Sequence, residues 1–349
     1  MPGLDAPGQG SIGLRPPTLR DRLAARIAHL LPLAYFRKLP GVIIVDATNV
    51  CNLRCPVCPT TFAMTRKRGM MRIEIFKRIV DDFRGRKERP SIYFNFSGEP
   101  TLNPELPEFI RYASEAGHET FLSTNATRLD APTCEGLIKS GLSRINLCMD
   151  GFSKKAQETY RVRSDFEQVK SNIERFLAIR RDLGSTKPFA VLQTLLTSYS
   201  ENQIQAMTEW AAAAGFDQIR YKTFSLGSYT SVEEKRRYSH FLPTRPDLLR
   251  HPNDEERLTC TAPRGQSVVF WNGDLGLCCI DYDRMVELPN IGEKGFIAAY
   301  LSRPAMKARK RGFLKQFEIC RGCSYSNADN LGFKINLQAK GKALEKATV

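Results

Sequence analysis

Apolar runs alternate with amphipathic segments from residue 40 to residue 223, and this alternation most limits what the chain can fold into. The apolar runs are rich in β-forming residues and occupy residues 42–46, 91–96, 119–123, 144–149, 188–196 and 217–223. Segments with helical periodicity separate them, at residues 72–85, 104–117, 131–141, 166–184 and 201–215. Such alternation predicts a parallel sheet, because parallel neighbours need a crossover connection. Six units are too few for a closed eight-stranded barrel, so we expect an α/β fold with a partial (β/α)6 barrel and chemistry at the carboxyl ends of its strands.

Three cysteines follow the first apolar run directly, with the spacing C-x3-C-x2-C. They are Cys51, Cys55 and Cys58. A structural zinc site needs four ligands, and no histidine stands nearby to supply the fourth. A catalytic thiol needs one cysteine and a base. Three thiolates on one loop suit an iron–sulfur cluster that keeps one iron open to an external ligand.

This spacing, after the first strand of a (β/α)6 pattern, resembles the radical S-adenosylmethionine superfamily. The resemblance implies a TIM-like partial barrel and a 4Fe–4S cluster held by Cys51, Cys55 and Cys58. It also implies that the open iron chelates the amino and carboxylate groups of S-adenosylmethionine. Reductive cleavage would then give a 5′-deoxyadenosyl radical that abstracts hydrogen from a substrate.

A second motif of that superfamily matches Ser97-Gly98-Glu99-Pro100, which follows the second predicted strand. Ser97 stands where the family has the first glycine of Gly-Gly-Glu-Pro. The resemblance places the strand edge and the Glu99 carboxylate against the methionyl ammonium, as expected for a cation held by a fixed carboxylate. The alternative is an ordinary turn with a solvated glutamate.

Further S-adenosylmethionine contacts are implied at three places. Ser123 and Asn125, after the third predicted strand, resemble the pair that contacts the ribose hydroxyls. Arg161, which we prefer to Arg163, would pair with the methionyl carboxylate. Val57 would lie against the adenine.

A second group of cysteines lies near the carboxyl terminus. Cys260 is followed by twelve residues, Gly273, four residues and Cys278, and a C-x2-C pair follows at Cys320 and Cys323. Residues 266–279 read as a hairpin that turns at Asn272–Gly273. This pattern resembles the SPASM extension in its shorter twitch form, as in the butirosin-pathway aminocyclitol dehydrogenase and, more distantly, the anaerobic sulfatase-maturating enzymes.

The resemblance implies a second, auxiliary 4Fe–4S cluster held by Cys260, Cys278, Cys320 and Cys323. The alternatives for these four thiols are a structural zinc ion and inert cysteines. We expect the neighbouring Cys279 to point away from the group, with hydrogen donation to a substrate radical as the other reading. Cys134 is expected to be a packing residue and Cys148 to face the barrel cavity. Asp281 is one candidate for the base that takes the substrate proton.

The charge of the chain bears on its partners. The 349 residues carry 52 Lys and Arg against 37 Asp and Glu, a formal net charge of +15. The basic residues are scattered apart from residues 307–315 and a short tail at 340–349. No aromatic-interleaved basic stripe is present, which disfavours a nucleic acid partner. An acidic electron donor such as flavodoxin or ferredoxin suits this surface. Residues 18–38 mix apolar and basic residues at helical spacing, so packing on the barrel or weak membrane-surface contact is expected there.

The predicted organisation has five parts. They are an N-terminal extension with an amphipathic basic helix (1–39), the radical S-adenosylmethionine barrel (40–225), a linker (226–258), the auxiliary-cluster domain (259–330) and a basic tail (331–349). We expect no signal peptide and no transmembrane segment. The ten cysteines then favour metal or catalytic thiols in the reducing cytoplasm.

The predicted reaction is a two-electron oxidation of an alcohol- or amine-bearing carbon on a small polyhydroxylated or amino-sugar-like substrate, with the auxiliary cluster as electron acceptor. The alternatives are modification of a peptide or protein side chain and a redox-neutral radical epimerisation or elimination. A different class of protein, a non-catalytic zinc- or cluster-bearing RNA-binding protein, is the remaining interpretation.

Overall fold

The six apolar runs form six parallel strands of one sheet in the computed structural model, which describes residues 19–226, 231–249, 258–320, 323, 332–337 and 347–348. Each strand pairs with the one before it in the sequence. The strands are β1 (Val42–Val45), β2 (Ser91–Phe94), β3 (Thr120–Thr124), β4 (Arg144–Cys148), β5 (Phe189–Leu196) and β6 (Gln218–Thr223). The predicted partial barrel is therefore confirmed.

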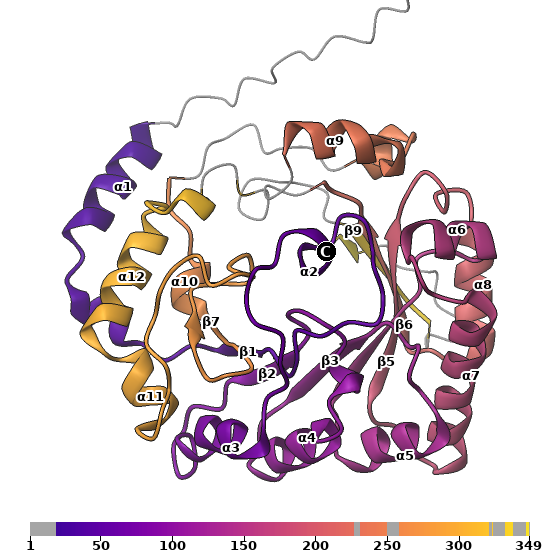
Figure 1. Cartoon of the computed structure of the whole chain (residues 1–349), viewed down its shortest axis with the longest axis horizontal. Helices are drawn as coiled ribbons and strands as arrows, with labels where there is room; N and C mark the ends of the chain where they lie inside the picture. Colours follow the sequence, from indigo (N-terminus) through magenta and orange to yellow (C-terminus); the bar gives the residue numbers. More distant parts are fainter. Residues whose placement is uncertain are drawn as a thin grey trace, which may run out of the picture.

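Helices cover the outer face of this curved sheet (Figure 1). They are α3 (Ile73–Asp81), α4 (Leu106–Glu115), α5 (Ala131–Lys139), α7 (Phe166–Asp182) and α8 (Ile204–Ala214), with the shorter α6 (Lys154–Tyr160) beside α7. Alternate strand residues such as Ile43, Ile145 and Leu192 pack with these helices in the main hydrophobic core. The remaining strand residues point to the inner side, where the short helix α2 (Pro59–Phe62) lies.

The sheet is open, and two later segments extend it. Strand β7 (Gln266–Val269) pairs parallel with β1, from Val42 opposite Gln266 to Val45 opposite Val269. Strand β8 (Leu275–Gly276) pairs antiparallel with β7, and Gly273 in the turn has a φ of 87°, which confirms the predicted hairpin. At the other edge β9 (Gly332–Asn336) pairs antiparallel with β6, and β10 (Ala347–Thr348) pairs with β9. The sequence did not predict that either segment joins the barrel sheet.

The hairpin is surrounded by three helices and a short helical turn. These are α10 (Ala262–Gly265), α11 (Gly295–Tyr300), α12 (Arg303–Phe313) and the 3-10 turn η5 (Glu318–Cys320). In the segment expected to be a linker, the described residues include α9 (Val232–Tyr238) and the short turns η3 (Ser239–Phe241) and η4 (Pro246–Leu248). The 3-10 turn η2 (Pro100–Leu102) follows β2.

The predicted N-terminal helix is interrupted at Pro32. It forms α1 (Leu19–Leu30) and the 3-10 helix η1 (Leu33–Arg37). Phe36 of η1 is fully buried, its ring lies 5.8 Å from that of Phe313, and its carbonyl accepts a hydrogen bond from Arg309 at 2.7 Å. Within the described residues, no helix is both long and apolar enough to cross a membrane.

Candidate active site

The first cysteine group lies on the loop that leaves β1 at its carboxyl end. Cys58 immediately precedes α2, and its amide donates to the carbonyl of Cys55 at 3.1 Å. The three thiols lie close enough to influence one another electrostatically. Burial raises the pKa of the Cys51 thiol and raises that of Cys55 to about 12. These groups would therefore ionise when a metal binds and otherwise hold their protons.

Gly98 allows the loop after β2 to approach the cysteine loop. Its φ is +68°, and a Cβ atom there would collide with the carbonyl oxygens of Thr48 and Val50. The next amide, that of Glu99, donates to the Val50 carbonyl at 2.8 Å. Backbone contact therefore fixes the second motif against the residue that precedes Cys51.

The Glu99 carboxylate is buried, with 2% of its surface exposed, and it accepts four hydrogen bonds within the chain. Thr101 donates its amide at 3.1 Å and its hydroxyl at 2.7 Å, the Thr124 hydroxyl donates at 2.6 Å, and the Asn125 amide donates at 2.7 Å. Burial raises the pKa of Glu99, against the lowering effect of these donors. In this structure Glu99 joins the β2 and β3 loops, and its contact with a methionyl ammonium stays a prediction.

The predicted ribose pair divides between two places. Ser123 lies on the inner side of β3, where its hydroxyl accepts a hydrogen bond from Asn146 at 2.9 Å. Asn125 follows β3 and donates its side-chain amide to Asn52, on the cysteine loop, at 3.0 Å. Asn125 thus orients the segment between Cys51 and Cys55, a link that the sequence did not indicate.

Of the two candidate arginines, Arg161 lies at the site. Its side chain is 18% exposed and pairs with Asp150 at 2.5 Å, whereas Arg163 is exposed. Burial alone would lower the pKa of Arg161, but the Asp150 carboxylate and the nearby Cys55 and Cys148 thiols raise it. Arg161 is therefore a fixed cation beside the first cysteine group.

Val57 is buried in a small cluster with Tyr160, Phe224 and Phe241. The cluster also contacts Cys55. The contact of Val57 with the adenine stays a prediction.

The inner side of the sheet carries polar side chains near its carboxyl end. Cys148 shares the inward register of Asn146 on β4, and Gln193 on β5 donates to its sulfur at 3.5 Å. This agrees with the prediction that Cys148 faces the cavity. The Asn146 side-chain oxygen is buried and has no hydrogen-bond partner among the described residues.

The second cysteine group surrounds one cavity of about 600 Å³. Cys260, Cys278, Cys320 and Cys323 all line it, with the cavity walls completed by α10, α12 and the start of β1. Cys279 does not point away from this group as we expected, because it lines the same cavity and also packs beside Ile44 and Phe270 on the inner side of the sheet. Cys134 is fully buried in α5, as predicted for a packing residue.

Asp281 lies in the loop that follows Cys279. It is fully buried, and its carboxylate accepts hydrogen bonds from the amides of Leu277 at 3.0 Å, Met285 at 2.6 Å and Val286 at 3.4 Å. These bonds close the loop after Cys279. In this structure Asp281 supports that loop, and its role as a base stays a prediction.

Arg66 connects the two cysteine-bearing regions, although no sequence pattern drew attention to it. Its guanidinium pairs with Asp46 at 3.1 Å, just after β1, and donates to the Ser97 hydroxyl at 3.3 Å. It also donates to the Tyr282 carbonyl at 2.8 Å and lies 4.2 Å from the centre of the Phe270 ring. One side chain thus joins the end of β1, the second motif and the hairpin.

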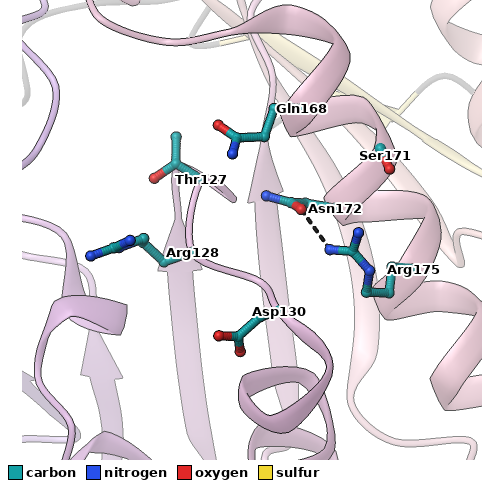
Figure 2. A pocket seen from close by; sticks show the side chains of 7 residues that line it. All are labelled: Thr127, Arg128, Asp130, Gln168, Ser171, Asn172 and Arg175. Atoms are coloured by element: carbon teal, nitrogen blue, oxygen red, sulfur yellow. Dashed lines mark hydrogen bonds between the residues drawn. The ribbon is translucent and has the colours of Figure 1, made fainter.

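A separate pocket of about 330 Å³ lies between the β3–α5 connection and helix α7 (Figure 2). Arg175 donates to Asn172 at 2.7 Å, as the dashed line in Figure 2 marks, and to the Leu129 carbonyl at 3.0 Å. Asn172 in turn donates to the Ala126 carbonyl at 2.9 Å. These bonds support the loop that carries Asn125. The residues of this pocket therefore have a structural role in holding that loop.

The donor sets fit iron–sulfur clusters. Three thiols share one loop, five thiols line one cavity, and none of the ten cysteines forms a disulfide. Across the described parts of the chain, no three His, Cys, Asp or Glu side chains converge closely enough to hold a single metal ion.

Comparison with known families gives two matches. The model of the radical SAM superfamily matches residues 45–211, and that of SPASM, an iron–sulfur cluster-binding domain, matches residues 260–324.

Curated relatives that match this chain include two proteins of archaeal origin. The 7,8-dihydro-6-hydroxymethylpterin dimethyltransferase of Methanocaldococcus jannaschii is 29% identical over 214 residues, covering 59% of this chain and 40% of the relative. The tungsten-containing aldehyde ferredoxin oxidoreductase cofactor-modifying protein of Pyrococcus furiosus is 26% identical over 178 residues, covering 51% and 49%. The chain thus spans less than half of the length of either relative.

Solved structures share the fold over most of the chain. BtrN in complex with AdoMet and 2-DOIA has a TM-score of 0.51 and 16% identity, covering 82% of this chain and 93% of that one. SuiB of Streptococcus suis bound to S-adenosylmethionine has a TM-score of 0.59 and 17% identity, covering 82% and 71%. The same protein has also been solved bound to its precursor peptide SuiA, with a TM-score of 0.57, 16% identity and coverage of 87% and 73%.

Proposed function

We propose that this chain, which is a radical S-adenosylmethionine enzyme with a SPASM iron–sulfur cluster-binding domain, dehydrogenates a small polyhydroxylated or amino-sugar-like substrate. The substrate would lose a hydrogen atom, a proton and one electron at an alcohol- or amine-bearing carbon. When bound, the cofactors supply reductive cleavage of S-adenosylmethionine, the radical that takes the hydrogen atom, and an acceptor for the electron. The non-catalytic, RNA-binding interpretation is set aside by this identification.

The roles we assign to residues follow from their positions. Cys51, Cys55 and Cys58 would hold the first cluster. Cys260, Cys278, Cys320 and Cys323 would hold the second. S-adenosylmethionine would be bound by Arg161 and by the loops that carry Val57, Ser97-Gly98-Glu99-Pro100, Ser123 and Asn125.

The observation that carries an electron-accepting role is the pairing of β7 with β1. Strand β1 leads into the first cysteine loop, and β7 begins at Gln266, which lines the cavity of the second cysteine group together with Val42 of β1. The two thiol sets therefore flank one pair of hydrogen-bonded strands. Four thiolates can complete the coordination of a second cluster, which leaves it suited to electron transfer and not to substrate binding.

The inner side of the sheet supports a small polar substrate. Ser123, Asn146 and Gln193 present hydroxyl and amide groups there, and the Asn146 oxygen is a buried acceptor without a partner in the described chain. A substrate hydroxyl or amine could supply the missing donor, because buried polar atoms are normally paired. That BtrN has been solved with 2-DOIA adds support from a protein of the same fold.

The double variant Cys320→Ala/Cys323→Ala tests the proposal. It should still cleave S-adenosylmethionine in an uncoupled manner while product formation stops. Because metal binding contributes to the folding of small domains, circular dichroism and the iron count must accompany the assay. A well-folded variant that retains one cluster and turns over substrate at the parent rate would contradict the electron-accepting role.

Peptide or protein side-chain modification is the second candidate function. It is favoured by the structure of SuiB bound to its precursor peptide. The two candidates separate when the enzyme is incubated with polyols and aminocyclitols in one series and with peptides in another, and the consumption of each is followed by mass spectrometry.

For either function we propose an acidic protein as electron donor, flavodoxin or ferredoxin, and a cytoplasmic location. The net charge of +15 supports the acidic donor, and ten cysteines without a disulfide support the cytoplasmic location.

A further inference from the structure

Helix α1 presents an apolar stripe to solvent. Leu19, Leu23, Ile27 and Leu30 recur at the spacing of one helix face, and their exposed fractions are 85%, 57%, 54% and 83%. Ala28 is buried. A helix in this position usually turns its leucines toward the protein, so this stripe needs a partner outside the described chain.

The stripe is held in place by contacts at the end of α1 and in η1. Phe36 of η1 is buried against Phe313, and the Lys310 side chain donates to the carbonyls of His29 at 2.8 Å and Leu31 at 2.7 Å. Figure 1 shows α1 at the outer side of α12. The end of α1 is thus fixed to the molecule, while its apolar face is directed away.

Exposed cations lie on α1 and on the segments that neighbour it. Arg22 and Arg26 are exposed on α1 itself, and Arg37 and Lys38 are exposed at the end of η1. The neighbouring α12 contributes Arg303, Lys307 and Arg311, all exposed and recurring every fourth residue, and it contains no acidic residue. An apolar stripe flanked by cations is the pattern of a helix that lies in the surface of an anionic bilayer.

We propose that α1 binds the surface of an anionic membrane, with its leucine stripe in the interface and the cations of α1, η1 and α12 against lipid headgroups. A second copy of the chain is a poorer partner, because pairing α1 with α1 would oppose like charges across the contact. At twelve residues the helix is about 18 Å long, which suits lying in the interface. This inference does not depend on the substrate proposed above.

Vesicle sedimentation of the cluster-loaded full chain tests the proposal. The parent protein should bind phosphatidylglycerol-containing vesicles and should bind phosphatidylcholine vesicles much more weakly, with binding reduced as salt is added. Leu23→Glu/Ile27→Glu should weaken binding roughly tenfold or more, because it places two carboxylates in the apolar stripe. Arg303→Gln/Lys307→Gln/Arg311→Gln should weaken binding to anionic vesicles alone, by about fivefold for each cation removed.

The matched control is Leu183→Glu/Val232→Glu, which introduces the same two charges at exposed apolar positions on other elements. This control should bind as the parent does, and circular dichroism should show all variants folded. Equal binding to neutral vesicles, no binding by the parent, or an unaffected Leu23→Glu/Ile27→Glu variant would each overturn the proposal. So would self-association of the parent that this variant abolishes without any vesicle binding.

Discussion

Two buried carboxylates near the first cysteine loop show how single residues hold the site together. Glu99 is satisfied by four neutral donors, whereas Asp46 is fully buried and paired with the Arg66 guanidinium. The sequence motif drew attention to Glu99 but not to Asp46 or Arg66, because neither residue of the pair belongs to a recognisable spacing. Arg66 lies 20 residues from Asp46, 31 from Ser97 and 216 from Tyr282 in the chain, so these groups meet only through the fold.

Glu99→Gln is expected to loosen the β2 and β3 loops. The carboxylate accepts hydrogen bonds at both oxygens, whereas the NH2 group of Gln can only donate and would face other donors. An unsatisfied buried polar group costs about 1–3 kcal/mol. The free energy of unfolding, measured in urea, should fall by that amount. If the methionyl ammonium binds Glu99, a charge-assisted hydrogen bond is also lost, and affinity for S-adenosylmethionine should fall roughly tenfold or more. Iron content should not change. The exposed Glu119→Gln serves as control, and an unchanged dissociation constant in Glu99→Gln would show that this carboxylate does not support the cofactor.

Arg66→Met should destabilise the fold in a pH-dependent manner. Losing one partner of a buried ion pair costs about 3 kcal/mol. Burial already raises the pKa of Asp46, and Arg66 lowers it, so the variant would raise this pKa further. A carboxyl whose pKa is higher in the folded state than in the unfolded state binds its proton more tightly when folded, so the free energy of unfolding falls as pH rises toward the folded-state pKa. The loss in free energy of unfolding, measured in urea, should therefore be larger at pH 8 than at pH 5. Adding Asp46→Asn should restore much of the lost stability. A loss that is independent of pH would exclude this account.

At the scale of elements, the strands could be read from the sequence because each is a short apolar run bounded by turn residues and followed by a helical period. All six predicted strands agree with the structure to within two residues at either end. The attachment of β7 and β9 to the barrel could not be read in this way. Both strands are short, and both pair with strands that are far away in the sequence. Pairing between such distant segments produces no local sequence pattern from which its register could be predicted.

The cysteine loop after β1 gives the prediction at this scale. Replacing Cys51, Cys55 and Cys58 together by alanine should leave about four of an expected eight irons, because the second thiol set is untouched. Formation of 5′-deoxyadenosine should cease. Cys134→Ala, which removes a buried thiol from α5, should retain all the iron. Cleavage of S-adenosylmethionine by the reconstituted triple variant would contradict the assignment of this loop.

At the scale of the whole molecule, one sheet runs through the parts that the sequence divided into separate domains. The hairpin covers the β1 edge of the six parallel strands and β9 covers the β6 edge. Uncovered edges invite pairing with other chains. The fragment 40–226, which contains only the barrel, should therefore aggregate when expressed alone.

The two tryptophans of the chain allow this unity to be measured in the full-length protein. Trp210 lies on α8 and donates to Glu174 at 3.0 Å, whereas Trp271 lies in the hairpin and donates to the Lys67 carbonyl at 3.1 Å. In Trp210→Phe, fluorescence reports on the hairpin, and in Trp271→Phe it reports on the barrel. If the shared sheet makes them one cooperative unit, the two variants should show coincident urea transitions that also match far-UV circular dichroism. If the urea midpoints of the two variants differ, the barrel folds independently and β7 only docks against its edge. A soluble, monomeric fragment 40–226 with a native circular dichroism spectrum would show the same.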